Sequence, residues 1–362
     1  MNRPFIKGLE LSELFYEEAV KPFLVARFPN VAYSAARLGH GSDVLGFDTP
    51  QSTDHDWGPK LMLFLSEVDH ETYRHQIDQR LRQELPSQIH GYSTNFGRHE
   101  DDTTVMAATV SGLINHEVQI LTVRGFFAGL LKLDPDQEPR TVDWLTIPEQ
   151  YLRSITSGRV FYDGLGQLEP MRAKLRYYPH DVWLYLLATQ WRRISQEEHF
   201  MGRCGQVGDE LGSCLVAARL VRDMMRLCFL MEHQYAPYIK WFGTAFKQLS
   251  CADELTPILT RVLNAPTWPE REKPLTEAYE FVAEMHNDLG ITEPLPTKVS
   301  PFHNRPFMII QADTFSDAIC AAITSEEVRA LPAHLGGIDQ FVDSTDVLSY
   351  PDRSDQLKIM YE

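Results

Sequence analysis

One short stretch carries the side chains whose types and spacing suit catalysis. Gly41–Ser42 comes first, residues 43–53 follow, and two aspartates, Asp54 and Asp56, then flank a single histidine. If Asp54 to Asp56 is extended, both carboxylates project to one face, with Cα atoms roughly 6.6 Å apart. Such oxygens suit Mg²⁺, which proteins hold with one or two carboxylates plus substrate phosphates. The backbone N–H groups and hydroxyl of Gly41–Ser42 would then bind the phosphates.

The same residue types also have a purely structural explanation. Aspartate, glycine and serine are common in turns, and Asp-x-Asp recurs by chance in an acidic protein. Two interpretations of Asp43 stay open. It could orient the turn backbone or bind a metal indirectly, or it could cap a helix. The Gly-Ser pair upstream favours the chemical interpretation of Asp54 and Asp56.

Three segments resemble a known family. Gly-Ser followed by Asp-x-Asp is similar to the signature of the nucleotidyltransferase superfamily related to DNA polymerase β. Residues 41–46, 52–58 and 235–241 more closely resemble the bacterial DUF4037 family, and kanamycin nucleotidyltransferase is a distant analogue. The resemblance implies an α+β fold, in which a mixed sheet with flanking helices precedes a mainly α-helical bundle.

The resemblance also implies an activity. The expected reaction moves an NMP, in the first instance AMP from ATP, to a hydroxyl of a small-molecule acceptor with Mg²⁺ or Mn²⁺ as cofactor. Gly41, Ser42 and Asp43 would bind the nucleotide, while Asp54 and Asp56 would bind the metal. Transfer of AMP to a protein or tRNA, or nucleotide binding without catalysis, are the alternatives.

Further acidic residues are candidates to complete the site. The superfamily brings a third carboxylate from a later strand, and Glu117 is the best placed acid after the motif, ahead of Asp101 and Asp102. The alternative for Glu117 is a place on the solvated face of its strand. Either Glu117 or Glu210 would accept the proton of the attacking hydroxyl.

Apolar runs predict the elements that must position these residues. Residues 31–38 form a strand candidate that leads into the glycine turn, and residues 60–65 suit a buried strand. Gly58–Pro59 lies between the two aspartates and that second strand, so a bulge or break is expected there. Residues 104–110 and 116–123 are two later strand candidates.

A segment rich in proline and charge, residues 134–148, predicts a connection between domains. The first domain would span residues 1–140 and carry the nucleotidyltransferase-like sheet. The second, residues 141–362, would be helical with a short strand and helix as a C-terminal extension.

The helical half offers cations as well. Arg219, Arg222 and Arg226 recur at helical spacing and could clamp a triphosphate, although pairing with neighbouring acids is more common and is favoured for Arg219. Lys240 belongs to an aromatic and basic cluster with Tyr235, Tyr238 and Trp241, which could stack on a base or form a packed wall.

Composition limits the partners. The formal net charge of −16 disfavours bulk nucleic-acid binding, although a nucleotide can still bind locally. Five widely spaced cysteines, together with the lack of an apolar signal segment or membrane-spanning run, predict a cytoplasmic protein with reduced thiols. The expected partners are a nucleoside triphosphate and a small acceptor, with no membrane; a homodimer is left open.

Overall fold

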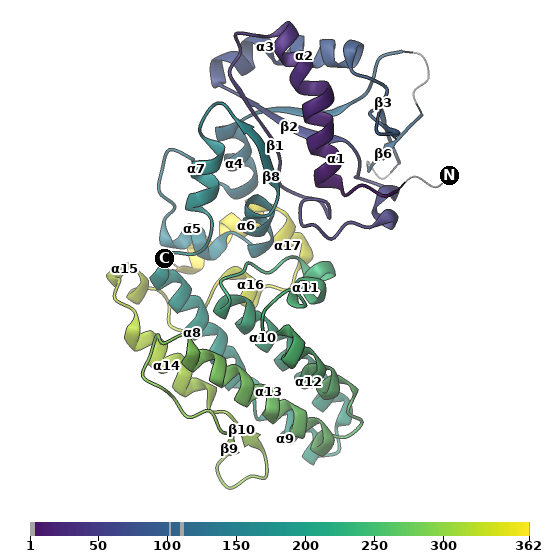
Figure 1. Cartoon of the computed structure of the whole chain (residues 1–362). Helices are drawn as coiled ribbons and strands as arrows, with labels where there is room; N and C mark the ends of the chain where they lie inside the picture. The colour runs from purple at the N-terminus through teal and green to yellow at the C-terminus, as the bar shows by residue number, and fades with distance from the viewer. Residues whose placement is uncertain (1–3, 101–102, 109–111, 362) are drawn as a thin grey trace. The chain divides into compact units, whose positions relative to one another are not determined.

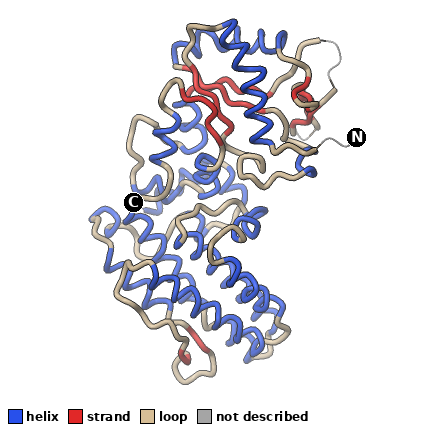
Figure 2. Tube along the Cα trace, viewed as in Figure 1, coloured by secondary structure: helices blue, strands red, loops and turns tan. Residues whose placement is uncertain are grey.

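The computed structural model describes residues 4–100, 103–108 and 112–361. It confirms the predicted fold class: a mixed four-stranded sheet with helices occupies the N-terminal region, and the C-terminal region is largely helical (Figures 1 and 2). The chain forms two compact units, residues 1–138 with 151–176 and residues 139–150 with 177–362. Each unit is described separately below.

The first unit contains the four-stranded sheet and most of the short ladders. Its helices are α1 (Gly8–Phe15), α2 (Lys21–Arg27), α3 (Glu67–Glu84), α4 (Val123–Leu131), most of α6 (Glu149–Thr156) and α7 (Leu168–Lys174), with a π-helical turn η1 (Tyr16–Val20) and a 3₁₀ turn η2 (Pro50–Asp54). Its strands are β1 (Tyr33–Arg37), β2 (Lys60–Leu65), β3 (Gln88–Ile89), β4 (Tyr92–Ser93), β5 (Phe96–Arg98), β6 (Thr104–Met106), β7 (Glu117–Thr122) and β8 (Arg159–Asp163).

The sheet has the order β7-β2-β1-β8. Strand β1 is antiparallel to both β2 and β8, whereas β2 and β7 run parallel. The carboxyl end of β1 therefore meets the amino ends of the other three strands at one edge of the sheet. The glycine turn leaves β1 at this edge, so the topology brings the predicted nucleotide loop to the start of β2 and β7.

Strand β2 is buried on both faces, which explains its continuous apolar sequence. Leu61, Leu63 and Leu65 belong to the core that also contains residues of α1 and α2. Phe64 points to the opposite face, where its ring lies 5.4 Å from that of Phe126 in α4. The bounds of β2 match the predicted strand 60–65.

Strand β8 is an element that the sequence interpretation missed. After residue 148 the sequence predicts helices followed only by a short C-terminal strand, yet residues 159–163 pair with β1 as an edge strand of the first sheet. Residues 151–176 consequently pack within the first unit. The predicted domains, 1–140 and 141–362, divide the chain at one point. In the structure, residues 139–150 belong to the second compact unit and residues 151–176 return to the first.

The second unit is nearly all helix apart from the short β9–β10 ladder (Figure 2). Its elements are α5 (Thr141–Thr146), α8 (His180–Glu197), α9 (Phe200–Gln206), α10 (Glu210–Met231), α11 (Ile239–Phe246), α12 (Ala252–Asn264), α13 (Trp268–Asp288), β9 (Ser300–Pro301), β10 (Met308–Ile309), α14 (Ala312–Ala322), α15 (Glu326–Arg329), α16 (Ile338–Phe341), α17 (Thr345–Ser349), α18 (Pro351–Asp355) and a 3₁₀ segment η3 (Gln356–Tyr361).

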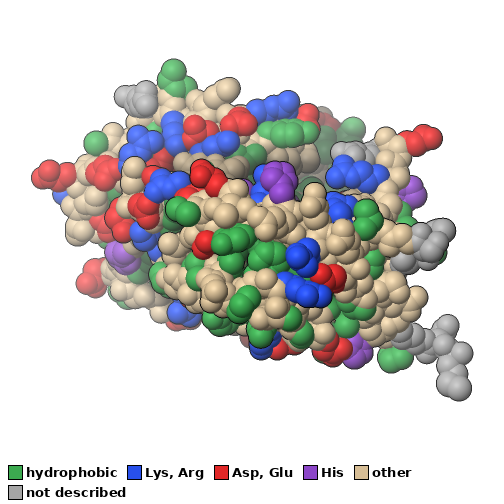
Figure 3. Space-filling view, turned by 90° about the horizontal axis from the view of Figure 1, so that it is seen from above, with side chains coloured by type: hydrophobic (Ala, Val, Ile, Leu, Met, Phe, Trp, Pro, Cys, Tyr) green, Lys and Arg blue, Asp and Glu red, His purple; other side chains and the backbone are tan. Residues whose placement is uncertain are grey.

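Two surface properties bear on the expected partners. Lys, Arg, Asp and Glu side chains are interspersed over the face seen in Figure 3. Within the described ranges, no helix is long and apolar enough to cross a membrane.

Candidate active site

Three charged side chains start or end neighbouring strands at the edge where the glycine turn lies. Arg37 ends β1, Lys60 starts β2, and Glu117 starts β7. Lys60 and Glu117 are direct partners in the parallel register, and Ala36 pairs with Met62 across the antiparallel one. The fold thus gathers the turn, one acid and two cations at one edge of the sheet.

The turn itself is fixed by a buried ion pair. Both Asp43 oxygens accept hydrogen bonds from Arg37, at 2.7 Å from Nε and 3.0 Å from Nη2, and the Asp43 side chain is only 2% exposed. The same guanidinium donates to the carbonyls of Leu38 and His40. Asp43 therefore orients the turn backbone through Arg37, which agrees with the first of its two interpretations and not with a helix cap.

Gly41 makes this arrangement possible. Its φ of +143° lies in a region that side chains rarely adopt, and a Cβ there would lie 2.0 Å from Asp43 Oδ1 and 2.7 Å from Arg37 Nη2. Glycine is required because the side chains of Asp43 and Arg37 occupy the space that a Cβ would take.

A second buried acid holds the far part of the loop. Asp48 Oδ2 accepts hydrogen bonds from the Gly8 backbone N–H, at 2.7 Å, and from Trp57 Nε1, at 3.0 Å. Lys7 lies 3.4 Å from its other oxygen. Asp48 consequently ties the loop to the start of α1, and neither Asp43 nor Asp48 faces solvent.

The expectation that Asp54–His55–Asp56 is extended is wrong. Asp54 ends the 3₁₀ turn η2, and Asp56 has a left-handed φ of +51°. Thr49 and Ser52 form a capping box around Pro50, which occupies a first-turn position where its missing N–H costs nothing. These caps favour a helical turn over a strand. Both Asp54 and Asp56 are solvent-exposed.

The Asp56 carboxylate is held by Thr104 of β6. Its Oδ1 accepts hydrogen bonds from the backbone N–H and the hydroxyl of Thr104, each at 2.9 Å. Burial alone would raise the pKa of Asp56, but the two bonds from Thr104 and the charge of Lys60 lower it below its usual range. The pKa change favours the ionised carboxylate, the form that binds a metal. Asp54 instead pairs with His55 Nδ1 at 3.0 Å.

Lys60 is the central residue that the sequence interpretation did not single out. Its ammonium donates to Thr104 Oγ1 at 3.2 Å. Burial and the Arg37 guanidinium lower the pKa of Lys60, while Glu117 and Asp56 act in the opposite direction. We call Arg37, Asp43, Asp56, Lys60, Thr104 and Glu117 the Lys60 cluster. The sequence signal for Lys60 is its position as the first residue of an otherwise apolar strand.

The donor chemistry of the Lys60 cluster suits Mg²⁺, although three acids are not gathered around one point. Within residues 4–100, 103–108 and 112–361, no three His, Cys, Asp or Glu side chains form a group that could hold a metal ion. Mg²⁺ at nucleotide sites needs only one or two protein carboxylates, because substrate phosphates supply the other oxygens. Glu117 is half-buried beside Lys60, and Asp101 and Asp102 lie outside the described residues.

The remaining predicted residues belong to the second unit. Glu210 accepts hydrogen bonds from the Trp268 backbone N–H at 3.2 Å and from Arg271 at 3.3 Å, so it stabilises the start of α13. Lys240 is exposed, with its ammonium 5.1 Å from the Trp241 ring. The contacts described for these two residues all lie within the second unit.

The arginine row of α10 is paired with acids. Arg219 lies 2.6 Å from Glu197, which confirms the pairing favoured for it, and Arg222 lies 2.5 Å from Asp343. The third member, Arg226, is described with the further inference.

A cavity of about 370 Å³ lies at the opposite edge of the sheet, by the carboxyl ends of β2 and β7. Its lining includes Leu65, Ser66, Val123, Arg124, Gly166 and Lys174. The cavity is thus separate from the edge that carries the Lys60 cluster.

Comparison with known families identifies one segment. Residues 144–242 match the DUF4037 domain. DUF4037 is described as a domain of unknown function, and its match includes the segment 235–241 but not residues 41–58. The match therefore supports the resemblance in the later part of the chain only.

Comparison with individual proteins adds a distant similarity. The crystal structure of a nucleotidyltransferase-like protein from Exiguobacterium sibiricum 255-15 is similar over 84% of this chain and 89% of its own, with 10% sequence identity and a TM-score of 0.33. A likeness this low carries no argument about the site. No curated protein sequence matches the chain.

Proposed function

We propose that this chain is a Mg²⁺-dependent nucleotidyltransferase that moves an NMP from a nucleoside triphosphate, in the first instance ATP, to a hydroxyl of a small-molecule acceptor. The observation that carries the proposal is the Lys60 cluster. A glycine turn, an ionised aspartate and a strand-borne glutamate meet at one sheet edge around a half-buried lysine. These are the parts that positioning and neutralising a triphosphate require.

Each residue has a role that its surroundings support. The Ser42 hydroxyl has no hydrogen-bond partner within the described part of the chain, so it and the turn N–H groups can bind phosphate oxygens. Asp56, with Asp54 beside it, would hold Mg²⁺. Lys60 would balance the carboxylates and lie near the incoming phosphates. Bound Mg²⁺ would neutralise charge on the triphosphate.

The chemistry balances with these groups. The acceptor hydroxyl oxygen forms a bond to the α-phosphorus, and the bond from that phosphorus to the bridging oxygen breaks, which releases pyrophosphate. Glu117 takes the hydroxyl proton. Glu210 is not assigned this role because it binds Arg271 and the backbone of α13.

The test is an acceptor screen with purified protein, labelled ATP and Mg²⁺. Pyrophosphate release that depends on an added metabolite fraction is the expected result, and Asp56→Asn should abolish it. Glu71→Gln, an exposed acid on α3, is the matched control and should keep full activity. Label found in tRNA or protein instead would favour the alternative acceptors. Wild-type activity in Asp56→Asn would contradict the site.

A non-catalytic nucleotide-binding protein is the second candidate, and one observation favours it. Thr104 already donates two hydrogen bonds to Asp56, and the nearby charge of Lys60 also favours its ionised form. This candidate predicts nucleotide binding that persists in EDTA, is lost in Lys60→Gln and yields no pyrophosphate with any acceptor. Metal-dependent binding would exclude it.

A further inference from the structure

The helical second unit contains a buried guanidinium that the proposed function does not use. The Arg226 side chain on α10 is only 11% exposed, and its Nε and Nη1 atoms have no hydrogen-bond partner among the described residues. Its nearest carboxylate partner, Glu149, lies 3.8 Å from Nη1, beyond hydrogen-bonding distance. The guanidinium carbon lies 5.6 Å from the centre of the Phe242 ring. Arg226 therefore retains donors that can bind an anion.

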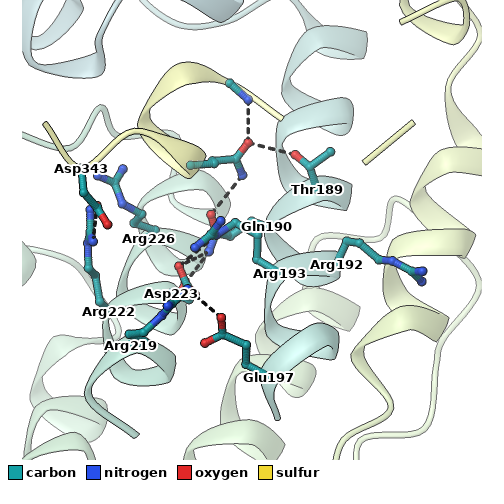
Figure 4. Close-up of polar contacts among 12 residues, drawn as sticks. Thr189, Gln190, Arg192, Arg193, Glu197, Arg219, Arg222, Asp223, Arg226 and Asp343 are labelled. Carbon is teal, nitrogen blue, oxygen red and sulfur yellow. Dashed lines mark hydrogen bonds and ion pairs between the residues drawn. The ribbon is translucent and has the colours of Figure 1, made fainter. Parts of the chain in front are cut away.

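Two further arginines, Arg222 and Arg193, add positive charge near Asp343. Arg222 lies one helical turn before Arg226 on α10, and Arg193 comes from α8. In Figure 4 Arg222 is joined to Asp343 and Arg226 lies beside them, whereas Arg192 points away. Burial would raise the pKa of Asp343, but Arg222, Arg226 and Arg193 together lower it. Arg222 therefore pairs with Asp343 directly, and the charges of Arg226 and Arg193 act on the same carboxylate.

Asp343 is loosely held compared with the segment that carries it. Its side chain is 77% exposed, and a surface ion pair of this kind contributes little stability. The segment is anchored instead by Gln340, which bonds to Thr189, Gln190 and the backbone of Leu186 and Gly337. The Asp343 carboxylate can therefore leave Arg222 while the anchor stays in place.

Other acids near Arg226 define what can bind there. Glu149 and Asp339 also face this guanidinium, and burial raises the pKa of Asp339. Asp223 pairs with Arg193 at 3.4 Å. Three arginines thus face four carboxyl groups, so an anion can enter only if Asp343 leaves.

We propose that Arg193, Arg222 and Arg226 form a binding site for the phosphate group of a small ligand, and that Asp343 occupies its mouth as an internal competitor. A phosphate offers three acceptor oxygens and more than one negative charge, which suits paired guanidinium groups better than one carboxylate does. The site lies wholly within the second unit and does not depend on nucleotidyl transfer in the first.

Calorimetric titration of the full chain with inorganic phosphate and with AMP, at matched ionic strength, tests the proposal. Asp343→Asn should tighten phosphate binding about two- to fivefold, the effect of removing a competing surface pair. Arg222→Gln should weaken it at least about tenfold, since charge-assisted bonds are lost. Two matched controls should change little: Asp346→Asn, an exposed acid of the same segment, and Arg219→Gln, an exposed arginine of the same helix.

The outcomes separate this site from the first unit. Lys60→Gln should leave phosphate binding by the second unit intact. A loss of activity in this variant would therefore concern nucleotidyl transfer alone. Preference for AMP over inorganic phosphate would indicate an organic phosphate ligand, and equal affinity would indicate the phosphate group itself. The proposal is overturned if neither probe binds, if Asp343→Asn does not tighten binding, or if Arg222→Gln leaves it unchanged.

Discussion

Two pairs of aspartates in one loop behave in opposite ways. Asp43 and Asp48 are buried, and each accepts hydrogen bonds from at least two donors of the protein. Asp54 and Asp56 are exposed, and the Asp54 carboxylate pairs with the neighbouring His55. The loop is therefore held by its first two acids, which leaves the last two available for a ligand. Residue type alone does not separate these roles, and neither does the number of donors, since Asp56 also accepts two hydrogen bonds; burial does.

The largest expected effect comes from breaking the buried pair. Asp43→Asn leaves the Arg37 guanidinium buried without its counter-charge, which should lower the free energy of unfolding by about 3–5 kcal/mol. Urea unfolding measures this loss. Asp54→Asn, in the same loop but 61% exposed, is the control and should change stability by less than about 0.5 kcal/mol. Equal losses in the two variants would remove the distinction between the pairs.

Gly41→Ala should disturb the same Arg37–Asp43 ion pair through the backbone. The new methyl group would overlap Asp43 Oδ1, and the φ of +143° is strained for any side chain, so we expect a loss of about 2–4 kcal/mol. Gly46→Ala is the matched control, because Gly46 has a φ of +76° but open space around it. It should cost about 1 kcal/mol. Thermal unfolding of both variants compares them, and a Gly41 cost no larger than that of Gly46 would show that the ion pair yields easily.

The exposed pair should show the reverse pattern. Asp56→Asn keeps an oxygen that can accept from Thr104, so stability should change by less than about 0.5 kcal/mol while Mg²⁺-dependent transfer is lost. Asp54→Asn should likewise reduce transfer without unfolding the protein. Parallel measurements of pyrophosphate release and melting temperature check this. A large loss of stability in either variant would show that the residue stabilises the loop, as Asp43 and Asp48 do.

The sequence predicted the elements better than it predicted the loop between them. Strand 60–65 was confirmed because six consecutive apolar or long side chains fit a strand covered on both faces. The extended Asp54–Asp56 was wrong because the caps at Thr49 and Ser52, with Pro50, nucleate a turn that the Asp-x-Asp pattern alone does not reveal. Thr49, Pro50 and Ser52 are themselves a sequence signal for this turn.

Long-range pairing was the part that local patterns could not supply. Strand β8 joins β1 across more than 100 residues, and its short run, residues 159–163, stands among helical patterns. Lys60 gains its importance from the register that sets it beside Glu117 and from Thr104, which binds both Lys60 and Asp56. The predictions of Mg²⁺, ATP and a small acceptor stay predictions, and they now concern a defined set of side chains.

The smallest expected effect tests how Asp56 differs from the buried pair. Thr104→Val removes the hydroxyl bond to Asp56 but keeps the backbone one, so the pKa of Asp56 should rise part of the way back to its usual value. A carboxyl whose folded pKa is lowered stabilises the fold above its unfolded pKa, and this contribution is lost as the pH falls through the folded pKa. The variant should therefore differ from wild type in stability more at pH 7 than below pH 3. NMR titration of the carboxyl carbon measures the pKa, and Thr72→Val, which removes a hydroxyl bonded only to a helix carbonyl, is the control. An unchanged Asp56 pKa would mean that the backbone bond and Lys60 suffice to keep this carboxylate ionised, and Thr104 would then position Lys60 more than Asp56.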